Sequence, residues 1–162
     1  MSKHHYISAE LLDLPTVKAI VEEQKILELS DEAILNIKKA KKYLDKKIAD
    51  NNQPIYGINT GFGSLYNVKI DSNNLTKLQE NIVMSHACGT GNLVPKQIVK
   101  LMLLLKIQSL SYGYSGVQLK TVQRLVDFYN LNIIPVIYEL GSLGASGDLA
   151  PLAHMALPLI GK

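Results

Sequence analysis

The chain has 162 residues, of which 47% are hydrophobic and 19% are charged, a balance typical of a folded globular protein rather than a disordered one. Its net charge is only +3 and Arg124 is its one arginine, which argues against nucleic-acid recognition, because that function relies heavily on arginine. The single cysteine, Cys88, excludes an internal disulfide framework and favours a reducing cytoplasm. The N-terminus has no apolar signal core, so we expect no secretion.

Hydrophobic spacing predicts a short helix over residues 16–24 and a short strand over residues 25–29. Ser30 is a candidate N-cap for a longer helix that runs to about residue 49, with acidic residues in its first turn. The polar side of this helix is rich in lysine. A solvated face explains these lysines more simply than an anionic partner does: Lys38, Lys39, Lys42, Lys46 and Lys47.

The segment 55–65 contains three glycines within seven residues and is predicted to form a sharply bent loop. It lacks the Gly-Lys-Ser/Thr ending of a phosphate-binding P-loop, and its glycine spacing does not fit the dinucleotide-binding fingerprint. Tyr56 carries a phenol that could act as an acid or base if its pKa were lowered. The alternative is a tyrosine that packs the loop onto the core.

Residues 74–86 are predicted to form the next helix, with Asn73 or Asn74 near its cap and His86 at its end. Glycine-rich sequence follows this helix. His86 and Cys88 stand two residues apart, but two side chains are an incomplete ligand set for zinc. We therefore expect no metal.

The segment 95–113 is apolar on nearly every face. Lys100, Lys106 and Gln108 interrupt it well short of the ~20 apolar residues of a membrane span, so we expect a helix buried in a bundle or an oligomer interface, and no membrane partner. A second amphipathic helix is predicted over residues 117–130, and an extended segment over 133–138. The expected fold class is mainly α, with a few short strands and three glycine-rich loops.

Residues 141–154 read Gly-Ser-Leu-Gly-Ala-Ser-Gly-Asp-Leu-Ala-Pro-Leu-Ala-His. Three glycines surround Ser146 directly before a predicted helix, for which Asp148 is a candidate N-cap. One interpretation is a glycine-rich turn that packs closely or binds an anion at the helix N-terminus. The other interpretation is backbone chemistry.

In that chemistry the amide nitrogen of Gly147 attacks the carbonyl carbon of Ala145, and water is lost. Loss of the Ser146 hydroxyl as a second water would leave a five-membered ring with an exocyclic methylene. The product is a carbon electrophile, which none of the standard side chains provides. The small residues that flank Ser146 suit this reaction because they let the two backbone atoms meet.

The stretch 141–154 resembles the signature of the histidine ammonia-lyase and aromatic amino acid lyase family. In that family Ala-Ser-Gly cyclises by itself to 4-methylideneimidazol-5-one. The resemblance therefore implies that this prosthetic group forms from Ala145, Ser146 and Gly147, with no metal, and that Asp148 helps to hold the turn.

Two other loops carry the same resemblance. Residues 56–63, Tyr-Gly-Ile-Asn-Thr-Gly-Phe-Gly, resemble the inner active-site loop of the family, which implies that Tyr56 removes the β-proton of the substrate. Asn59 and Gly61 of this loop are expected to bind substrate. Residues 85–89, Ser-His-Ala-Cys-Gly, resemble the substrate-side segment of the histidine lyases, which implies that His86 orients the substrate.

The implied reaction is the non-oxidative elimination of ammonia from an L-amino acid. L-histidine, which would give urocanate, is the first choice of substrate because of Ser85 and His86. A tyrosine or phenylalanine ammonia-lyase, or an aminomutase, is the enzymatic alternative.

The resemblance covers essentially the whole chain. Residues 1–162 are thus expected to be a single helical N-terminal segment of the ammonia-lyase fold that ends just after the signature, with the central and C-terminal parts absent. The implied partners are an amino acid substrate and further copies of the chain in a cytoplasmic homotetramer. A hypothesis from a different class is a non-catalytic truncated fragment or assembly module.

Overall fold

The computed structural model describes residues 3–50, 53–61, 63–70, 74–142, 144–145 and 147–162. Within these ranges it contains six α-helices, four short strands and two short 3-10 helices, which confirms the mainly helical class. The chain divides into two compact units. Unit 1 comprises Met1–Lys47 and Pro95–Ile134, and unit 2 comprises Ile48–Val94 and Pro135–Lys162.

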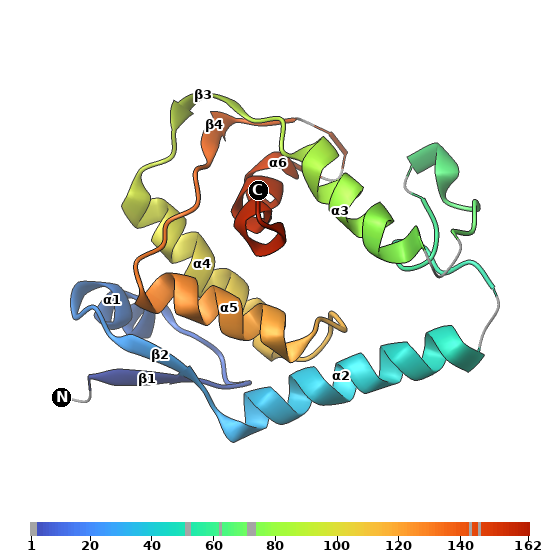
Figure 1. Ribbon diagram of the computed structural model, residues 1–162. Helices are drawn as coiled ribbons and strands as arrows, with labels where there is room; N and C mark the ends of the chain where they lie inside the picture. The colour runs from blue at the N-terminus through green and yellow to red at the C-terminus, as the bar shows by residue number, and fades with distance from the viewer. Residues whose placement is uncertain (1–2, 51–52, 62, 71–73, 143, 146) are drawn as a thin grey trace. The chain divides into compact units, whose positions relative to one another are not determined.

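Unit 1 begins with a β-α-β arrangement (Figure 1). Strand β1 (His4–Ile7) pairs in parallel with β2 (Ile26–Leu29), and α1 (Leu14–Glu22) connects them. Helix α1 begins two residues before the predicted position, because the Asp13 carboxylate accepts the Thr16 N–H at 2.9 Å and caps the helix. The strand at β2 was predicted. Strand β1 was not, since its four residues show no clear alternation of polar and apolar side chains.

Helix α2 (Asp31–Asp50) follows β2 and starts where the sequence predicts it. The hydroxyl of Ser30 accepts the Ala33 N–H at 3.1 Å, which confirms Ser30 as the cap. Two glycines after α4 allow close contact with α2: a Cβ on Gly113 would lie 2.7 Å from the carbonyl oxygen of Asn36, and one on Gly116 would lie 2.6 Å from Leu44. Both glycines have positive φ, +78° and +66°, so any other residue would also be strained there.

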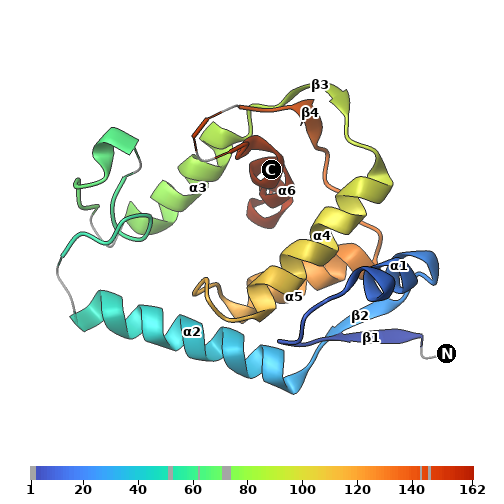
Figure 2. The same ribbon diagram turned by 180° about the vertical axis from the view of Figure 1, so that it is seen from behind.

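Helices α4 (Lys96–Ser111) and α5 (Leu119–Asn130) lie side by side in unit 1 (Figures 1 and 2). The predicted burial of α4 is largely confirmed, although Ile98 and Leu105 are each 48% exposed. The core of this unit is formed by side chains that are almost completely buried: Ile7, Ile20, Leu27, Ile37, Val99, Leu103, Leu104, Ile107, Val122 and Val126. The side chain of Asn130 joins α5 to β2, since it both accepts from and donates to the Leu27 backbone at 2.9 Å.

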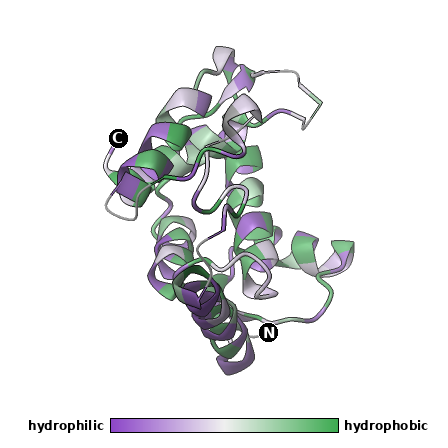
Figure 3. Ribbon diagram, turned by 90° about the vertical axis from the view of Figure 1, so that its right-hand side faces the viewer, coloured by the Kyte–Doolittle hydropathy of each residue, from purple (hydrophilic) through white to green (hydrophobic). Residues whose placement is uncertain are grey.

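Both hydrophilic and hydrophobic residues occur along the helices (Figure 3). In the part of the chain that the structure describes, no helix is long and apolar enough to cross a membrane.

Unit 2 contains η1 (Gly63–Leu65), α3 (Leu75–His86), β3 (Thr90–Leu93), β4 (Tyr138–Leu140), α6 (Ala150–Ala156) and η3 (Leu157–Ile160). Helix α3 confirms the prediction for 74–86, and Asn74 is its N-cap, whereas Asn73 lies outside the described residues. Strands β3 and β4 pair antiparallel, and α3 packs against α6. Strand β3 was not predicted, because its residues are all exposed and include a glycine and an asparagine, which are rare in strands.

Candidate active site

The three loops predicted to carry the chemistry all belong to unit 2. Ser146, the central residue of the cyclising triad, lies outside the described residues, as does Phe62 of the Tyr56 loop. The residues on both sides of Ser146 are described, and their contacts define the loop in which the triad lies.

Gly144 and Gly147 are described residues on either side of Ser146. The Gly147 N–H donates to the Gly144 carbonyl at 3.0 Å, and Gly147 has a φ of +85°, in the left-handed region that favours glycine. Among the described residues, no atom lies within 4 Å of a Cβ built on Gly144 or on Gly147. Gly147 thus supplies a backbone conformation that other residues rarely adopt.

Asp148 holds the two ends of the signature loop together. Its Oδ1 accepts the Ser142 N–H at 3.0 Å and the Ala150 N–H at 3.1 Å. A Cβ on Gly141 would lie 2.1 Å from both carboxylate oxygens, so Gly141 leaves the space that the carboxylate occupies. The prediction that Asp148 is the N-cap is wrong by one residue. Leu149 takes that position without a side-chain hydrogen bond, because Asp148 reaches two residues ahead to the first helical N–H.

The Tyr56 loop is held by Asn59. The side chain of Asn59 accepts the Ile55 N–H at 2.6 Å and donates to the Gln53 carbonyl at 3.2 Å, and it is 4% exposed. The Gly61 N–H donates to the Val68 carbonyl at 3.3 Å. In the structure these contacts stabilise the loop itself, and the substrate-binding roles of Asn59 and Gly61 stay predictions.

Tyr56 lies in the turn that Asn59 stabilises. The N–H groups of Ile58 and Asn59 both donate to the Ile55 carbonyl, and Gly57 has a φ of +75°. The tyrosine side chain is 60% exposed. It is therefore not packed into a core of the described residues.

His86 is the last residue of α3 and is half-buried. Its Nδ1 lies 2.8 Å from the Ile82 carbonyl and 3.2 Å from the hydroxyl of Ser85. A carbonyl can only accept, so Nδ1 is the donor in this contact, and in the tautomer with its one proton on Nδ1 the other nitrogen, Nε2, is an acceptor.

His154 is a residue of this region that the sequence interpretation quoted in the signature but gave no role. Its Nε2 accepts the Gly89 N–H at 2.9 Å, and its ring meets that of Tyr138 edge-on at 5.4 Å. The side chain is 8% exposed. It thus joins α6 to the segment that follows His86. One feature of the sequence could have predicted that His154 is buried: it lies one helical turn after Ala150, which is also buried.

The chain matches the profile of one protein family, described as aromatic amino acid lyase, over residues 12–162. The chain belongs to this family. A histidine ammonia-lyase of Legionella pneumophila (strain Paris) is 48% identical over 162 residues, which are 100% of this chain and 32% of that protein. A histidine ammonia-lyase of Staphylococcus aureus (strain JH9) is 41% identical over 157 residues, 97% of this chain and 31% of that protein.

Solved structures of aromatic amino acid lyase relatives share the fold of this chain. A tyrosine aminomutase from Streptomyces globisporus is 33% identical with a TM-score of 0.88, over 98% of this chain and 30% of that chain. A histidine ammonia-lyase from Trypanosoma cruzi is 35% identical with a TM-score of 0.83, over 96% of this chain and 30% of that chain. The likeness confirms the ammonia-lyase fold. The chain spans about a third of the length of the curated relatives it matches.

The carboxylate of Asp148 is a testable part of this lyase signature. We expect Asp148→Ala to lower the free energy of unfolding by about 1 kcal/mol, because it leaves the Ser142 and Ala150 N–H groups without their acceptor. Urea denaturation followed by circular dichroism measures the change. Asp148→Asn keeps an acceptor oxygen and should retain most of the stability. Equal stability of the Ala variant and the unmodified chain would contradict the bridging role.

Proposed function

We propose that this chain forms part of a histidine ammonia-lyase, which eliminates ammonia from L-histidine without oxidation and gives urocanate. The observation that carries the proposal is the backbone hydrogen bond between Gly147 and Gly144, in a loop fastened by Asp148 and in the same unit as Tyr56 and His86. The histidine ammonia-lyases that are 41–48% identical to the chain support the choice of substrate.

This loop suits formation of 4-methylideneimidazol-5-one from Ala145, Ser146 and Gly147. The left-handed φ of Gly147 and the absence of described neighbours around Gly144 and Gly147 leave room for a ring at this place. Once formed, the group supplies a carbon electrophile, which side chains do not offer. Asp148 fixes the backbone on either side of the triad through its two hydrogen bonds.

The remaining chemistry falls to side chains. The β-proton of an amino acid is only weakly acidic, so a positioned base is needed, and the exposed phenol of Tyr56 on its stabilised turn suits that role. The free acceptor of His86, Nε2, suits a substrate whose side chain offers a hydrogen-bond donor. The imidazole of histidine and the phenol of tyrosine have such a donor, whereas the ring of phenylalanine has none.

Two alternatives are supported by particular observations. The tyrosine aminomutase from Streptomyces globisporus, with a TM-score of 0.88, favours a tyrosine lyase or aminomutase. The half-exposed Ile98 and Leu105 on α4 favour a non-catalytic assembly module, because apolar surface promotes association.

The same exposed apolar surface on α4 supports assembly into a homotetramer. The single free Cys88 supports a cytoplasmic location.

The test combines a mass measurement with rates. The first sample is the purified 162-residue chain, and the second is a chimera in which residues 1–162 replace the matching part of the Legionella pneumophila relative. We expect each intact mass to fall short of the calculated value by two water molecules, and the chimera to act faster on L-histidine than on L-tyrosine or L-phenylalanine. A chimera that has the mass deficit but prefers tyrosine would contradict the histidine assignment. The full calculated mass in both samples would contradict ring formation.

A further inference from the structure

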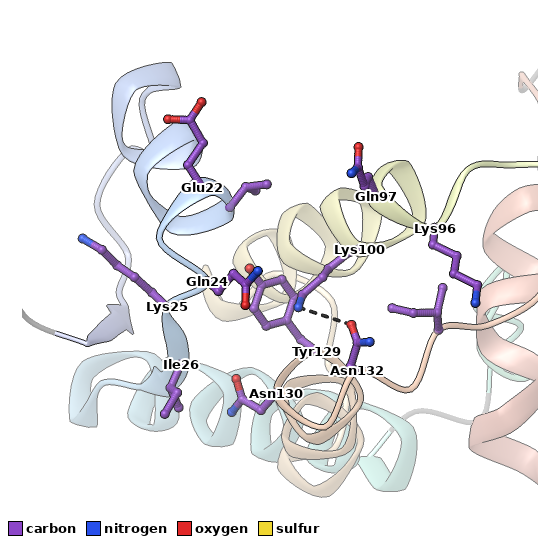
Figure 4. Close-up of a pocket in the computed structure, with 12 residues that line it drawn as sticks. Glu22, Gln24, Lys25, Ile26, Lys96, Gln97, Lys100, Tyr129, Asn130 and Asn132 are labelled. Carbon is purple, nitrogen blue, oxygen red and sulfur yellow. Dashed lines mark hydrogen bonds between the residues drawn. The ribbon is translucent and has the colours of Figure 1, made fainter.

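A cavity of about 690 Å³ lies within unit 1, between the C-terminal ends of α1 and α5 and the first turns of α4 (Figure 4). This volume is typical of sites for small organic ligands. All residues that line it belong to unit 1, whereas the residues of the candidate active site belong to unit 2. The inference drawn from this cavity is independent of the proposed function.

The lining of the cavity carries an excess of positive charge. Lys25, Lys96 and Lys100 line it, with Glu22 as the one acidic residue. Lys25 already pairs with Glu23 at 3.3 Å, and Glu22 pairs with Lys18 at 3.8 Å. Within the described ranges, no ion pair joins Lys96 or Lys100 to a carboxylate. The ammonium of Lys100 does donate a hydrogen bond to the side-chain oxygen of Asn132 at 3.4 Å. The α4 side of the cavity therefore presents two cations that no carboxylate of the described residues neutralises.

The ends of the surrounding helices act in opposite directions on an anion. Helix α4 has 16 residues from Lys96 to Ser111, with Pro95 as an N-cap that makes no side-chain hydrogen bond, so the positive end of its dipole lies at Lys96. The C-terminal ends of α1 and α5 carry the negative ends of their dipoles, and several of their carbonyls already accept hydrogen bonds. The Lys25 N–H donates to Ile20 at 3.0 Å and the Ile133 N–H donates to Phe128 at 2.9 Å.

Tyr129 contributes a buried donor to this lining. The side chain is 2% exposed, and its hydroxyl finds no hydrogen-bond partner among the described residues. Figure 4 shows its ring between the side chains of Gln24 and Lys100, and the ammonium of Lys100 lies 4.7 Å from the ring centre. Burial raises the pKa of Tyr129, so the hydroxyl stays protonated and can donate. A buried hydroxyl without a partner is uncommon, and an acceptor atom of a ligand would satisfy it.

The other half of the lining is apolar and includes Val21, Ile26 and Ile134. A bare inorganic anion would make no use of this surface. We propose that the cavity binds a small organic carboxylate with an apolar, aromatic body. Lys96, Lys100 and the Tyr129 hydroxyl bind the carboxylate, and the apolar side chains pack against the ring.

The test is a nuclear magnetic resonance titration of the ¹⁵N-labelled 162-residue chain with three probes. They are 2-naphthoate, the uncharged 2-naphthamide and inorganic phosphate. We expect 2-naphthoate to shift the backbone amides of residues 96–100 and 129–132 saturably, with a Kd at least about tenfold lower than that of either other probe. Equal binding of the amide or of phosphate would overturn the proposal, as would shifts confined to unit 2 or no shifts at all.

Substitutions of the residues proposed to bind the carboxylate of 2-naphthoate test where it lies in the cavity. Lys100→Gln and Tyr129→Phe should each raise the Kd of 2-naphthoate about tenfold, because each removes a hydrogen bond to a charged group. Lys120→Gln changes the charge equally at the opposite end of α5 and should leave the Kd unchanged. Tyr129→Phe removes only a hydroxyl that has no partner in the described part of the chain, so its spectrum should show an intact fold. Unchanged binding by this folded variant would overturn the proposal.

Discussion

Replacing Ser146 by alanine is expected to abolish the loss of two water molecules from the chain. Alanine has no hydroxyl to eliminate, so the exocyclic methylene cannot form, even though the Gly144–Gly147 hydrogen bond remains possible. Intact mass spectrometry of the 162-residue chain and of the chimera gives the readout, and histidine turnover by the chimera should fall to background with the electrophile lost.

Ser142→Ala is the matched control for this substitution. Ser142 lies in the same loop, and it contacts Asp148 through its backbone N–H, which alanine keeps. The control should show the same mass deficit and turnover as the unmodified protein. A Ser146→Ala chimera that retains turnover would remove the Ala145–Gly147 triad from the mechanism.

Tyr56→Phe is expected to lower kcat of the chimera by about 10²- to 10⁴-fold, the usual contribution of a general base. The ring-forming residues are untouched, so the deficit of two water molecules should persist. The loop should also persist, because the hydrogen bonds of Asn59 to the backbone of Ile55 and Gln53 remain. Initial rates over a range of histidine concentrations separate kcat from KM.

Tyr66→Phe provides the matched control, since Tyr66 is 61% exposed and Tyr56 is 60% exposed. The control should retain full turnover. If the two variants had equal activity, Tyr56 would not be the base.

The helices were the most predictable part of the fold. Apolar spacing and caps are local signals, and they placed α2 behind Ser30 and ended α3 at His86. Strands β1 and β3 escaped prediction because neither shows the alternation of polar and apolar residues that marks β2: β1 begins with two histidines, and all residues of β3 are exposed. Their pairing with a partner strand elsewhere in the chain is visible only in the folded structure.

The site was predictable at the level of motifs but not of contacts. The glycine-rich turn and the tyrosine loop could be recognised from their residues alone. The internal hydrogen bonds of Asn59 and the link from His154 to Gly89 could not, because they depend on backbone groups whose positions only the folded chain defines. The N-cap of α6 was placed one residue too early, because the Asp148 carboxylate accepts the first helical N–H, that of Ala150, from just outside the helix.

The contact between Gly141 and Asp148 has a consequence for how the signature can evolve. A side chain at position 141 would collide with the carboxylate of Asp148. If Asp148 were replaced by a smaller residue while Gly141 stayed, the space beside Gly141 would be left empty. The two positions should therefore change together or not at all, and the first step of any such change passes through a disfavoured intermediate sequence. Gly141 and Asp148 both lie within residues 141–150. A graft of this segment onto another scaffold would therefore bring along the hydrogen bonds of Asp148 that hold the loop together.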